Sequence, residues 1–213
     1  MRTLYMSPFS PYTRKVRVML AEKGLEFESR KVATDRFPTD YASTINPCAR
    51  VPALDDNGFV LFESNVILDY LLTRYPETPK NASQPPLVKT LVRPDKRWED
   101  SEILVAIETV LNCGLTMLRF GAHSGVTSDP PYLARDHLRV QSILDWLEKR
   151  ATPEGFVPGS FSVLDLNLII TVQWVDFRKL FEWRGRPYID KLVAFHDRRP
   201  TIPAIHPTMP VAF

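Results

Sequence analysis

The chain has 213 residues, of which 44% are hydrophobic and 11% aromatic, enough apolar material for one large domain or two small ones. Its 27 basic and 25 acidic residues are mixed along the sequence and give a net charge of +2. No basic stripe or tail could follow a phosphate backbone, so we expect no nucleic-acid partner.

The amino terminus and the cysteines indicate the compartment. Between Met1 and Val18, prolines and basic residues interrupt any apolar signal core, and no apolar run is long enough to cross a membrane. Cys48 and Cys113 are far apart and match neither a disulfide framework nor the spacing of zinc ligands. We therefore expect a cytoplasmic protein in a reducing compartment, with no membrane partner and no metal.

The first third of the chain predicts alternating strands and helices. Ser10 precedes Pro11 at a helix start, and Gly24 suits the helix end. Asn57-Gly58 between two apolar runs is a strong hairpin signal. The expected elements are strand 3–6, helix 11–23, strand 27–32, helix 39–45, strands 51–54 and 59–62, and helix 64–75.

Beyond a proline-rich stretch, only helices are predicted. We expect a first domain over residues 1–77, a linker over 78–89 and an all-helical domain over 90–213. Apolar residues at helical spacing predict helices near 95–120, 131–150, 163–180 and 187–198. Four prolines after Arg199 predict an extended tail on the surface.

The position of Ser10 at a helix start allows two interpretations of its role. A serine at a helix start can be a simple cap for a backbone amide. It can also donate its hydroxyl to a negatively charged ligand held at the helix start, where unpaired amides are positively polarised. Ser7 is a rival donor because it also lies at the strand end, but only Ser10 is followed directly by proline.

Three motifs together resemble the glutathione S-transferase superfamily, and in particular its serine-type, bacterial-like members. Ser10-Pro11-Tyr12 is similar to the serine-type active-site turn, Arg50-Val51-Pro52 to the cis-proline loop, and Glu63-Ser64 to the start of the glutamyl-binding helix. The resemblance covers nearly the whole chain. It implies a thioredoxin-like first domain followed by an all-helical domain, hence α/β plus all-α, and a homodimer. It also implies that Ser162 and Asp165 form the family's capping box.

The chemistry that this resemblance implies can be stated physically. A free thiol has a pKa of about 8.5, yet the nucleophile is the thiolate. A hydrogen bond to a charged group contributes about 1.5 to 3 kcal/mol, which lowers a pKa by about 1 to 2 units. Ser10 would therefore stabilise the thiolate of glutathione as a donor. A cysteine at this position would instead form mixed disulfides, so thiol-disulfide exchange is disfavoured.

The resemblance also assigns the glutathione contacts. It makes Val51-Pro52 a cis peptide that turns the Val51 amide and carbonyl toward the cysteinyl part of the tripeptide. Glu63 would hold the ligand's ammonium and Ser64 its carboxylate, although both could be only a helix cap. Arg50 would reach the glycyl carboxylate, or be a solvated surface side chain.

The second substrate's pocket is the least defined part of the prediction. Candidates from the first turn and the central helices are Phe9, Tyr12, Thr109, Cys113, Met117 and Trp174, but such residues at helical spacing are more often core. The predicted activity is transfer of glutathione to a hydrophobic electrophile, with glutathione as co-substrate. Two alternatives stay open: a glutathione-dependent isomerase or dehalogenase, and a binding or regulatory protein of the same fold.

Overall fold

The computed structural model describes residues 1–33, 37–76, 84–123 and 131–202. The chain separates into two compact units, Val92–Asp197 and Met1–Leu91, the latter together with the chain from Arg198 onward. The return of residues 198–202 to the first unit differs from the expected grouping of this segment with the helical domain. Hydrogen bonds between these residues and the rest of the first unit account for the difference.

A four-stranded mixed sheet forms the centre of the first unit. The strands β1 (Arg2–Met6), β2 (Glu28–Lys31), β3 (Ala53–Asp56) and β4 (Phe59–Phe62) lie in the order β2-β1-β3-β4. β1 pairs parallel with β2 and antiparallel with β3, and β3 pairs antiparallel with β4. β3 begins two residues later than predicted because Pro52 has no amide hydrogen for a ladder, so Val51 and Pro52 belong to the preceding loop.

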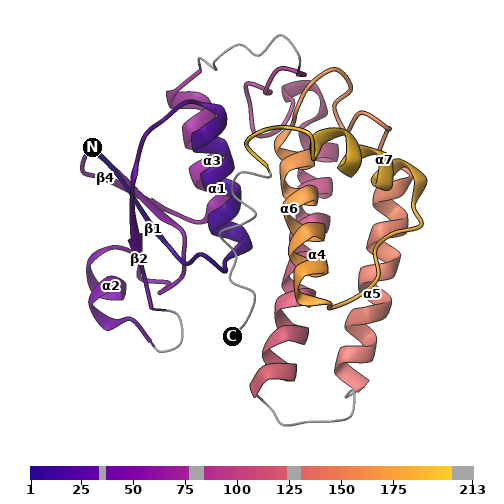
Figure 1. Cartoon of the computed structure of the whole chain (residues 1–213), viewed down its shortest axis with the longest axis horizontal. Helices are drawn as coiled ribbons and strands as arrows, with labels where there is room; N and C mark the ends of the chain where they lie inside the picture. Colours follow the sequence, from indigo (N-terminus) through magenta and orange to yellow (C-terminus); the bar gives the residue numbers. More distant parts are fainter. Residues whose placement is uncertain (34–36, 77–83, 124–130, 203–213) are drawn as a thin grey trace. The chain divides into compact units, whose positions relative to one another are not determined.

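Three helices accompany this sheet. The helices α1 (Pro11–Glu22) and α3 (Ser64–Arg74) pack against each other, and Figure 1 shows them side by side, apart from α2 (Thr39–Thr44). Their buried faces include Val16, Leu20, Ile67 and Leu71. Gly24 follows α1 with a φ of 64°, a left-handed conformation that glycine adopts without steric penalty. This arrangement is thioredoxin-like, as predicted.

The second unit contains only helices among its described residues. A short 3-10 turn, Pro94–Lys96, precedes α4 (Arg97–His123), which is followed by α5 (Pro131–Glu148), α6 (Val163–Arg178) and α7 (Pro187–His196). α4 packs against both α5 and α6, and α7 packs against α5 and α6. The four long helices were predicted to within a few residues of their observed bounds.

The capping box predicted at the start of α6 is present. The amide of Asp165 donates to the Ser162 hydroxyl at 3.1 Å, and the amide of Ser162 donates to the Asp165 carboxylate at 2.8 Å. The same carboxylate accepts a third hydrogen bond from the amide of Phe156 at 2.8 Å. Asp165 therefore stabilises both the helix start and the loop before it.

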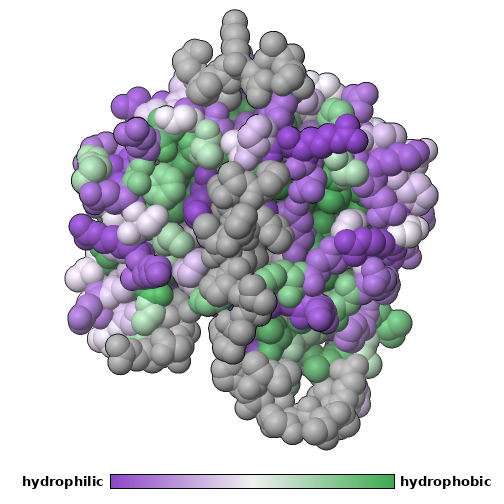
Figure 2. Space-filling model, in the orientation of Figure 1, coloured by the Kyte–Doolittle hydropathy of each residue, from purple (hydrophilic) through white to green (hydrophobic). Residues whose placement is uncertain are grey.

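One helical stretch, residues 94–120, is long and apolar enough to cross a membrane by length and composition. A core helix of a soluble protein passes the same test, and α4 buries Ile103, Ile107 and Leu111 inside its unit. This stretch is accordingly weak evidence for a membrane span. Figure 2 shows hydrophobic residues interspersed with hydrophilic ones over the visible face.

Candidate functional site

Strand register brings the three predicted motifs to one end of the sheet. Tyr5, near the end of β1, is paired with Ala53, the first residue of β3, and Ala53 is paired with Phe62, the last residue of β4. The residues after β1, before β3 and after β4 therefore emerge at the same end. These are the segments that contain Ser10, Arg50-Val51-Pro52 and Glu63-Ser64.

Ser10 is the N-cap of α1. Its Oγ accepts a hydrogen bond from the amide of Thr13 at 3.2 Å, and its own amide donates to the carbonyl of Ser7 at 3.2 Å. The cap uses only a lone pair of the hydroxyl, so the hydroxyl proton remains able to donate to a ligand. Ser10 is half-buried, whereas Ser7 is only 5% exposed. Ser10 can therefore cap α1 and donate a hydrogen bond to a ligand at the same time.

The loop before β3 presents Val51 through a cis peptide bond to Pro52, as the resemblance implied. The carbonyl of Arg50 accepts two hydrogen bonds of 2.7 Å, from the Tyr41 hydroxyl and from Nδ2 of Asn46. Asn46 also accepts the amide of Cys48 at 2.9 Å. Two buried side chains therefore hold the backbone beside Val51, while the Arg50 side chain itself is exposed.

Burial changes the pKa of Tyr41, one of the two residues that hold the Arg50 carbonyl. It raises the pKa of Tyr41 to about 12, and the hydrogen bond involving Asn46 partly offsets that increase. The Tyr41 hydroxyl is therefore a protonated donor throughout the neutral range. The sequence analysis did not assign Tyr41 or Asn46 to the site; the Asn46-Pro47 pair was interpreted only as a turn.

Glu63 and Ser64 stand at the start of α3. Glu63 is the N-cap residue with a φ of 72° and an exposed side chain. Ser64 is only 1% exposed, and its hydroxyl donates to the Glu63 carboxylate at 3.2 Å. The hydroxyl has a single proton to donate, so a ligand carboxylate at Ser64 would replace this contact. The ligand contacts predicted for both residues stay predictions.

Two of the predicted electrophile contacts belong to the first unit. Phe9 and Tyr12 are both half-buried beside the Ser10 turn in the sequence. The Lys15 ammonium lies 4.9 Å from the centre of the Tyr12 ring, an arrangement typical of a cation–π contact. Lys15 is fully buried, so this contact holds the Tyr12 ring in a defined orientation.

The other predicted electrophile contacts lie in the second unit, where Trp174, Cys113 and Met117 are buried and Thr109 is half-buried. Trp174 is 1% exposed and packs on Gly114, where any Cβ would lie 3.2 Å from the ring. Its Nε1 has no hydrogen-bond partner among the described residues. Cys113 and Met117 are 5% and 8% exposed, and the Thr109 hydroxyl donates to the Val105 carbonyl. The role of these four residues in a pocket stays a prediction.

The two cysteines are free thiols. Cys48 is exposed, next to the loop that carries Arg50. Burial raises the pKa of Cys113, and hydrogen bonding from Arg139 partly opposes the increase. Cys113 is therefore a neutral thiol at physiological pH. Among the described residues, no cluster of His, Cys, Asp and Glu side chains could hold a metal ion.

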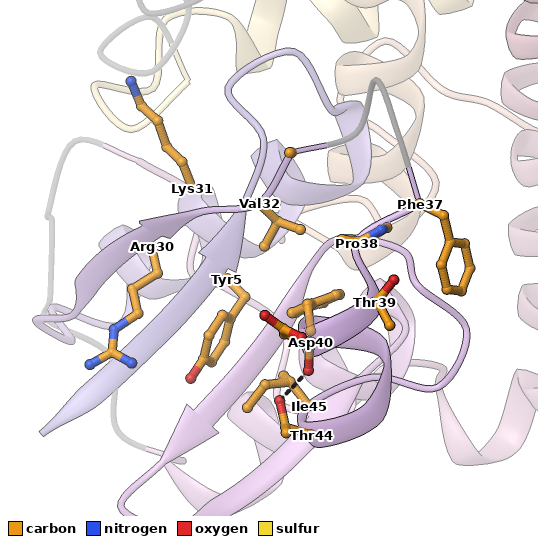
Figure 3. Close-up of a pocket in the computed structure, with 12 residues that line it drawn as sticks. Tyr5, Arg30, Lys31, Val32, Phe37, Pro38, Thr39, Asp40, Thr44 and Ile45 are labelled. Carbon is orange, nitrogen blue, oxygen red and sulfur yellow. Dashed lines mark hydrogen bonds between the residues drawn. The ribbon is translucent and has the colours of Figure 1, made fainter.

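A pocket of about 690 Å³ is lined by residues of β2, the end of β1 and α2. Figure 3 shows Tyr5, Asp40 and Ile45 facing this space, and the dashed line joins the Thr44 hydroxyl to the Asp40 carbonyl. Its lining includes Tyr41, which holds the Arg50 carbonyl, but none of the residues predicted for the site.

Comparison with known proteins identifies the family of this chain. Residues 4–79 match the family model of the glutathione S-transferase N-terminal domain, and residues 130–198 match that of the C-terminal domain. The chain belongs to the glutathione S-transferase superfamily. The two matches occur in the expected order and cover most of the chain.

Individual relatives differ in name and in coverage. A stringent starvation protein A homolog of Coxiella burnetii is 42% identical over 77 residues, which are 36% of this chain and 36% of that protein. The alignments with this and the similarly named Haemophilus influenzae protein span less than half of those relatives' length. A glutathione S-transferase of Silene vulgaris is 28% identical over 187 residues, 84% of this chain and 85% of that protein.

Solved structures show the same fold over almost the full length. A glutathione transferase family member from Pseudomonas fluorescens Pf-5, with bound glutathione, has a TM-score of 0.78 and 25% identity and covers 96% of this chain and 98% of that one. The two-domain superfamily architecture therefore extends over both units of this chain.

Proposed function

We propose that this protein is a serine-type glutathione transferase that activates the thiol of glutathione for attack on a small hydrophobic electrophile. The observation that carries the proposal is the convergence of Ser10, the Val51–Pro52 cis peptide and Glu63-Ser64 at one end of the sheet. The Pseudomonas fluorescens relative with bound glutathione supports it.

In this mechanism Ser10 is a hydrogen-bond donor and not a nucleophile. The glutathione thiol loses its proton to solvent, and the Ser10 hydroxyl, at the positively polarised start of α1, stabilises the sulfur anion. The thiolate then forms a bond to an electrophilic carbon, and the leaving group departs with the electron pair of the bond that breaks. Ser10 stays covalently unchanged.

The remainder of the site holds the tripeptide. Val51 pairs with the cysteinyl backbone of glutathione, Glu63 binds its ammonium and Ser64 its glutamyl carboxylate, while Arg50 binds the glycyl carboxylate. Tyr41 and Asn46 support this arrangement indirectly, because they hold the Arg50 carbonyl. Phe9 and Tyr12 contribute the part of the electrophile pocket that lies beside the thiolate.

A glutathione titration followed by a panel of electrophiles tests the proposal. The wild-type protein should bind glutathione at millimolar concentration or below, and absorbance of the bound thiolate should titrate below the free thiol pKa of about 8.5. Ser10→Ala should raise that pKa and lower turnover more than tenfold. Unchanged turnover in this variant would remove Ser10 as the donor.

Product analysis distinguishes a related activity at the same site. A glutathione-dependent isomerase, or a dehalogenase that regenerates glutathione, returns the co-substrate at the end of the cycle. A conjugating transferase consumes one glutathione for each electrophile. Loss of free glutathione in step with product therefore supports conjugation.

The names of several relatives leave room for a second candidate of a different class. Several are stringent starvation protein A homologs, a name that states no glutathione chemistry. A binding or regulatory protein that keeps the fold without turnover is therefore the alternative. Calorimetry with glutathione separates the two readings. No heat of binding at millimolar glutathione would favour the regulatory protein.

The proposed enzyme is a cytoplasmic homodimer. Phe59, Phe62 and Val66 are 56%, 38% and 49% exposed on β4 and α3, and Trp98 and Val105 are 74% and 65% exposed on α4. Apolar side chains of this size are candidates for burial between subunits. Light scattering should give twice the 24.5 kDa chain mass, and Phe62→Glu should shift the protein toward monomer.

A further inference from the structure

The residues that follow α7 return to the first unit and bind α1. Arg199, 5% exposed, donates from Nε and Nη2 to the Glu22 carboxylate at 3.1 and 2.6 Å. Its Nη1 donates to the carbonyl of Pro85 at 2.9 Å. The Thr201 hydroxyl is a further donor to the same carboxylate. Glu22 is the last residue of α1, so this buried cluster is attached to the end of the helix opposite Ser10.

A second attachment lies near the start of the same helix. Nη2 of Arg14 donates to the carbonyl of Ile202 at 3.2 Å, and both residues are buried. Arg14 is also the residue whose backbone amide donates to the Ser10 carbonyl, at 3.1 Å. Arg14 and Glu22 are about 12 Å apart along the helix axis. Residues 199–202 therefore run antiparallel to α1, from its last residue toward its first turn.

We propose that residues 199–202 form a strap that positions α1 and thereby the Ser10 turn for thiolate binding. The strap holds α1 at two points through buried charge-assisted hydrogen bonds, which are strong and directional. Its residues do not act on the substrate: Arg199 and Thr201 act through Glu22, and Ile202 acts through Arg14. This inference rests on the proposed transferase function.

Positioning matters here because the Ser10 hydroxyl and the positively polarised start of α1 must meet the same sulfur atom. A misplacement of about 1 Å in such a group can lower a rate by about two orders of magnitude. Arg199→Lys keeps the positive charge but loses the planar pair of donors that grips the Glu22 carboxylate. The strap should then loosen while the ion pair survives in part.

The chain contains a matched control in its second unit. Arg93 donates from Nε and Nη2 to the Asp100 carboxylate at 3.0 and 2.6 Å, nearly the same geometry as the pair of Arg199 with Glu22. Arg93→Lys thus removes an equivalent two-donor pair without touching α1. Thr201→Val is a milder strap variant that removes a single donor. It replaces Arg199→Lys in the test if that variant does not fold.

Both lysine variants should lower the melting temperature. The strap variants alone should move the pKa of bound glutathione toward that of the free thiol, and Arg199→Lys should lower kcat/KM at neutral pH about tenfold. The opposite result is an equal fall in melting temperature in both lysine variants, with the thiol pKa and kcat/KM unchanged. It would mean that the strap only stabilises the fold, and it would overturn the proposal.

Hydrogen exchange separates failure of the strap from failure of the transferase function. The amides of Thr13 and Arg14 bond to Ser10 without any ligand. They should exchange faster in Arg199→Lys than in Arg93→Lys even if the protein binds no glutathione. Equal exchange at these amides would reject the strap, whereas absence of glutathione binding to the wild type would reject only the transferase function.

Discussion

The Tyr41 hydroxyl donates a 2.7 Å hydrogen bond to the carbonyl of Arg50, the residue that directly precedes Val51. Nδ2 of Asn46 donates to the same carbonyl, also at 2.7 Å. A carbonyl with both lone pairs occupied cannot rotate without losing a bond. The orientation of the Val51 peptide is therefore fixed by two residues that do not contact a ligand in the proposed mechanism.

Tyr41→Phe should weaken glutathione binding and leave the chemical step almost unchanged. The variant loses one of two hydrogen bonds to Arg50, a change of about 1 kcal/mol, so the dissociation constant of glutathione should rise about fivefold. Calorimetry measures this constant, and steady-state kinetics should show KM raised with kcat nearly constant.

Tyr70→Phe is the matched control for this prediction. The Tyr70 hydroxyl donates to Asp56 at 3.0 Å, and Asp56 pairs with Arg2 at the opposite end of β1 and β3. This variant should lose comparable stability but bind glutathione like the wild type. Equal weakening of binding in both variants would show that Tyr41 acts only through global stability.

Ser10→Gly should separate the two roles of Ser10. Glycine at an N-cap position costs only a few tenths of a kcal/mol relative to serine, whereas alanine costs about 1 kcal/mol. The glycine variant should therefore keep nearly the wild-type melting temperature and still lose turnover more than tenfold, because it has no hydroxyl. The alanine variant should lose both stability and turnover.

Ser7→Ala provides the comparison for the donor assignment. The Ser7 carbonyl accepts the amide of Ser10, and that backbone bond survives the substitution. Turnover should stay within a factor of a few of the wild type. A larger loss of turnover in Ser7→Ala than in Ser10→Gly would transfer the donor role to Ser7.

Local signals in the sequence predicted most of the fold. Asn57-Gly58 indicated the hairpin, and apolar spacing together with Ser162 and Asp165 indicated α6, because these patterns act over a few residues. The hydrogen bonds from Tyr41 and Asn46 to Arg50 could not be predicted in this way, because their acceptor is a backbone carbonyl, which every residue has. Arg199 and Glu22 are 177 residues apart, and no periodicity connects them.

Gly155→Ala should destabilise the second unit more than Gly159→Ala. Both glycines have positive φ, 131° and 76°, so alanine is strained at either position: by about 1 to 2 kcal/mol near 76°, and by more at 131°, a conformation that is essentially restricted to glycine. At Gly155 the added Cβ would also lie 2.7 Å from Oδ1 of Asp165, whereas at Gly159 nothing lies within 4 Å. Chemical denaturation should show a loss of about 2 to 4 kcal/mol for Gly155→Ala.

Gly155 differs from Gly159 both in its φ and in its contact with Asp165. Asp165 holds the amides of Phe156 and Ser162, so a shifted carboxylate would release donors on both sides of the loop. Equal destabilisation by both alanine substitutions would show that backbone strain, and not the approach to Asp165, makes glycine necessary at position 155.

Asp165 should also make the stability of the protein depend on pH. Burial raises the pKa of Asp165 from 3.8 to about 6, while hydrogen bonds from Ser162 and Phe156 oppose the increase. The folded state therefore binds this proton more tightly than the unfolded state. The contribution of Asp165 to the free energy of unfolding is therefore largest below about pH 4. It declines by about 3 kcal/mol as the pH rises to about 6, and it is constant above that pH.

Asp165→Asn measures this contribution directly, because asparagine does not titrate. The free energy of unfolding of the wild type minus that of Asp165→Asn should fall as the pH rises from about 4 to about 6. Two ionisable groups act on the carboxylate: His196, whose Nε2 lies 3.9 Å from it, and Arg93, whose positive charge lowers the pKa of Asp165. His196→Gln in both backgrounds removes the nearer one. A difference that instead increases with pH would mean that the hydrogen bonds from Ser162 and Phe156 outweigh burial, and that folding lowers the pKa of Asp165.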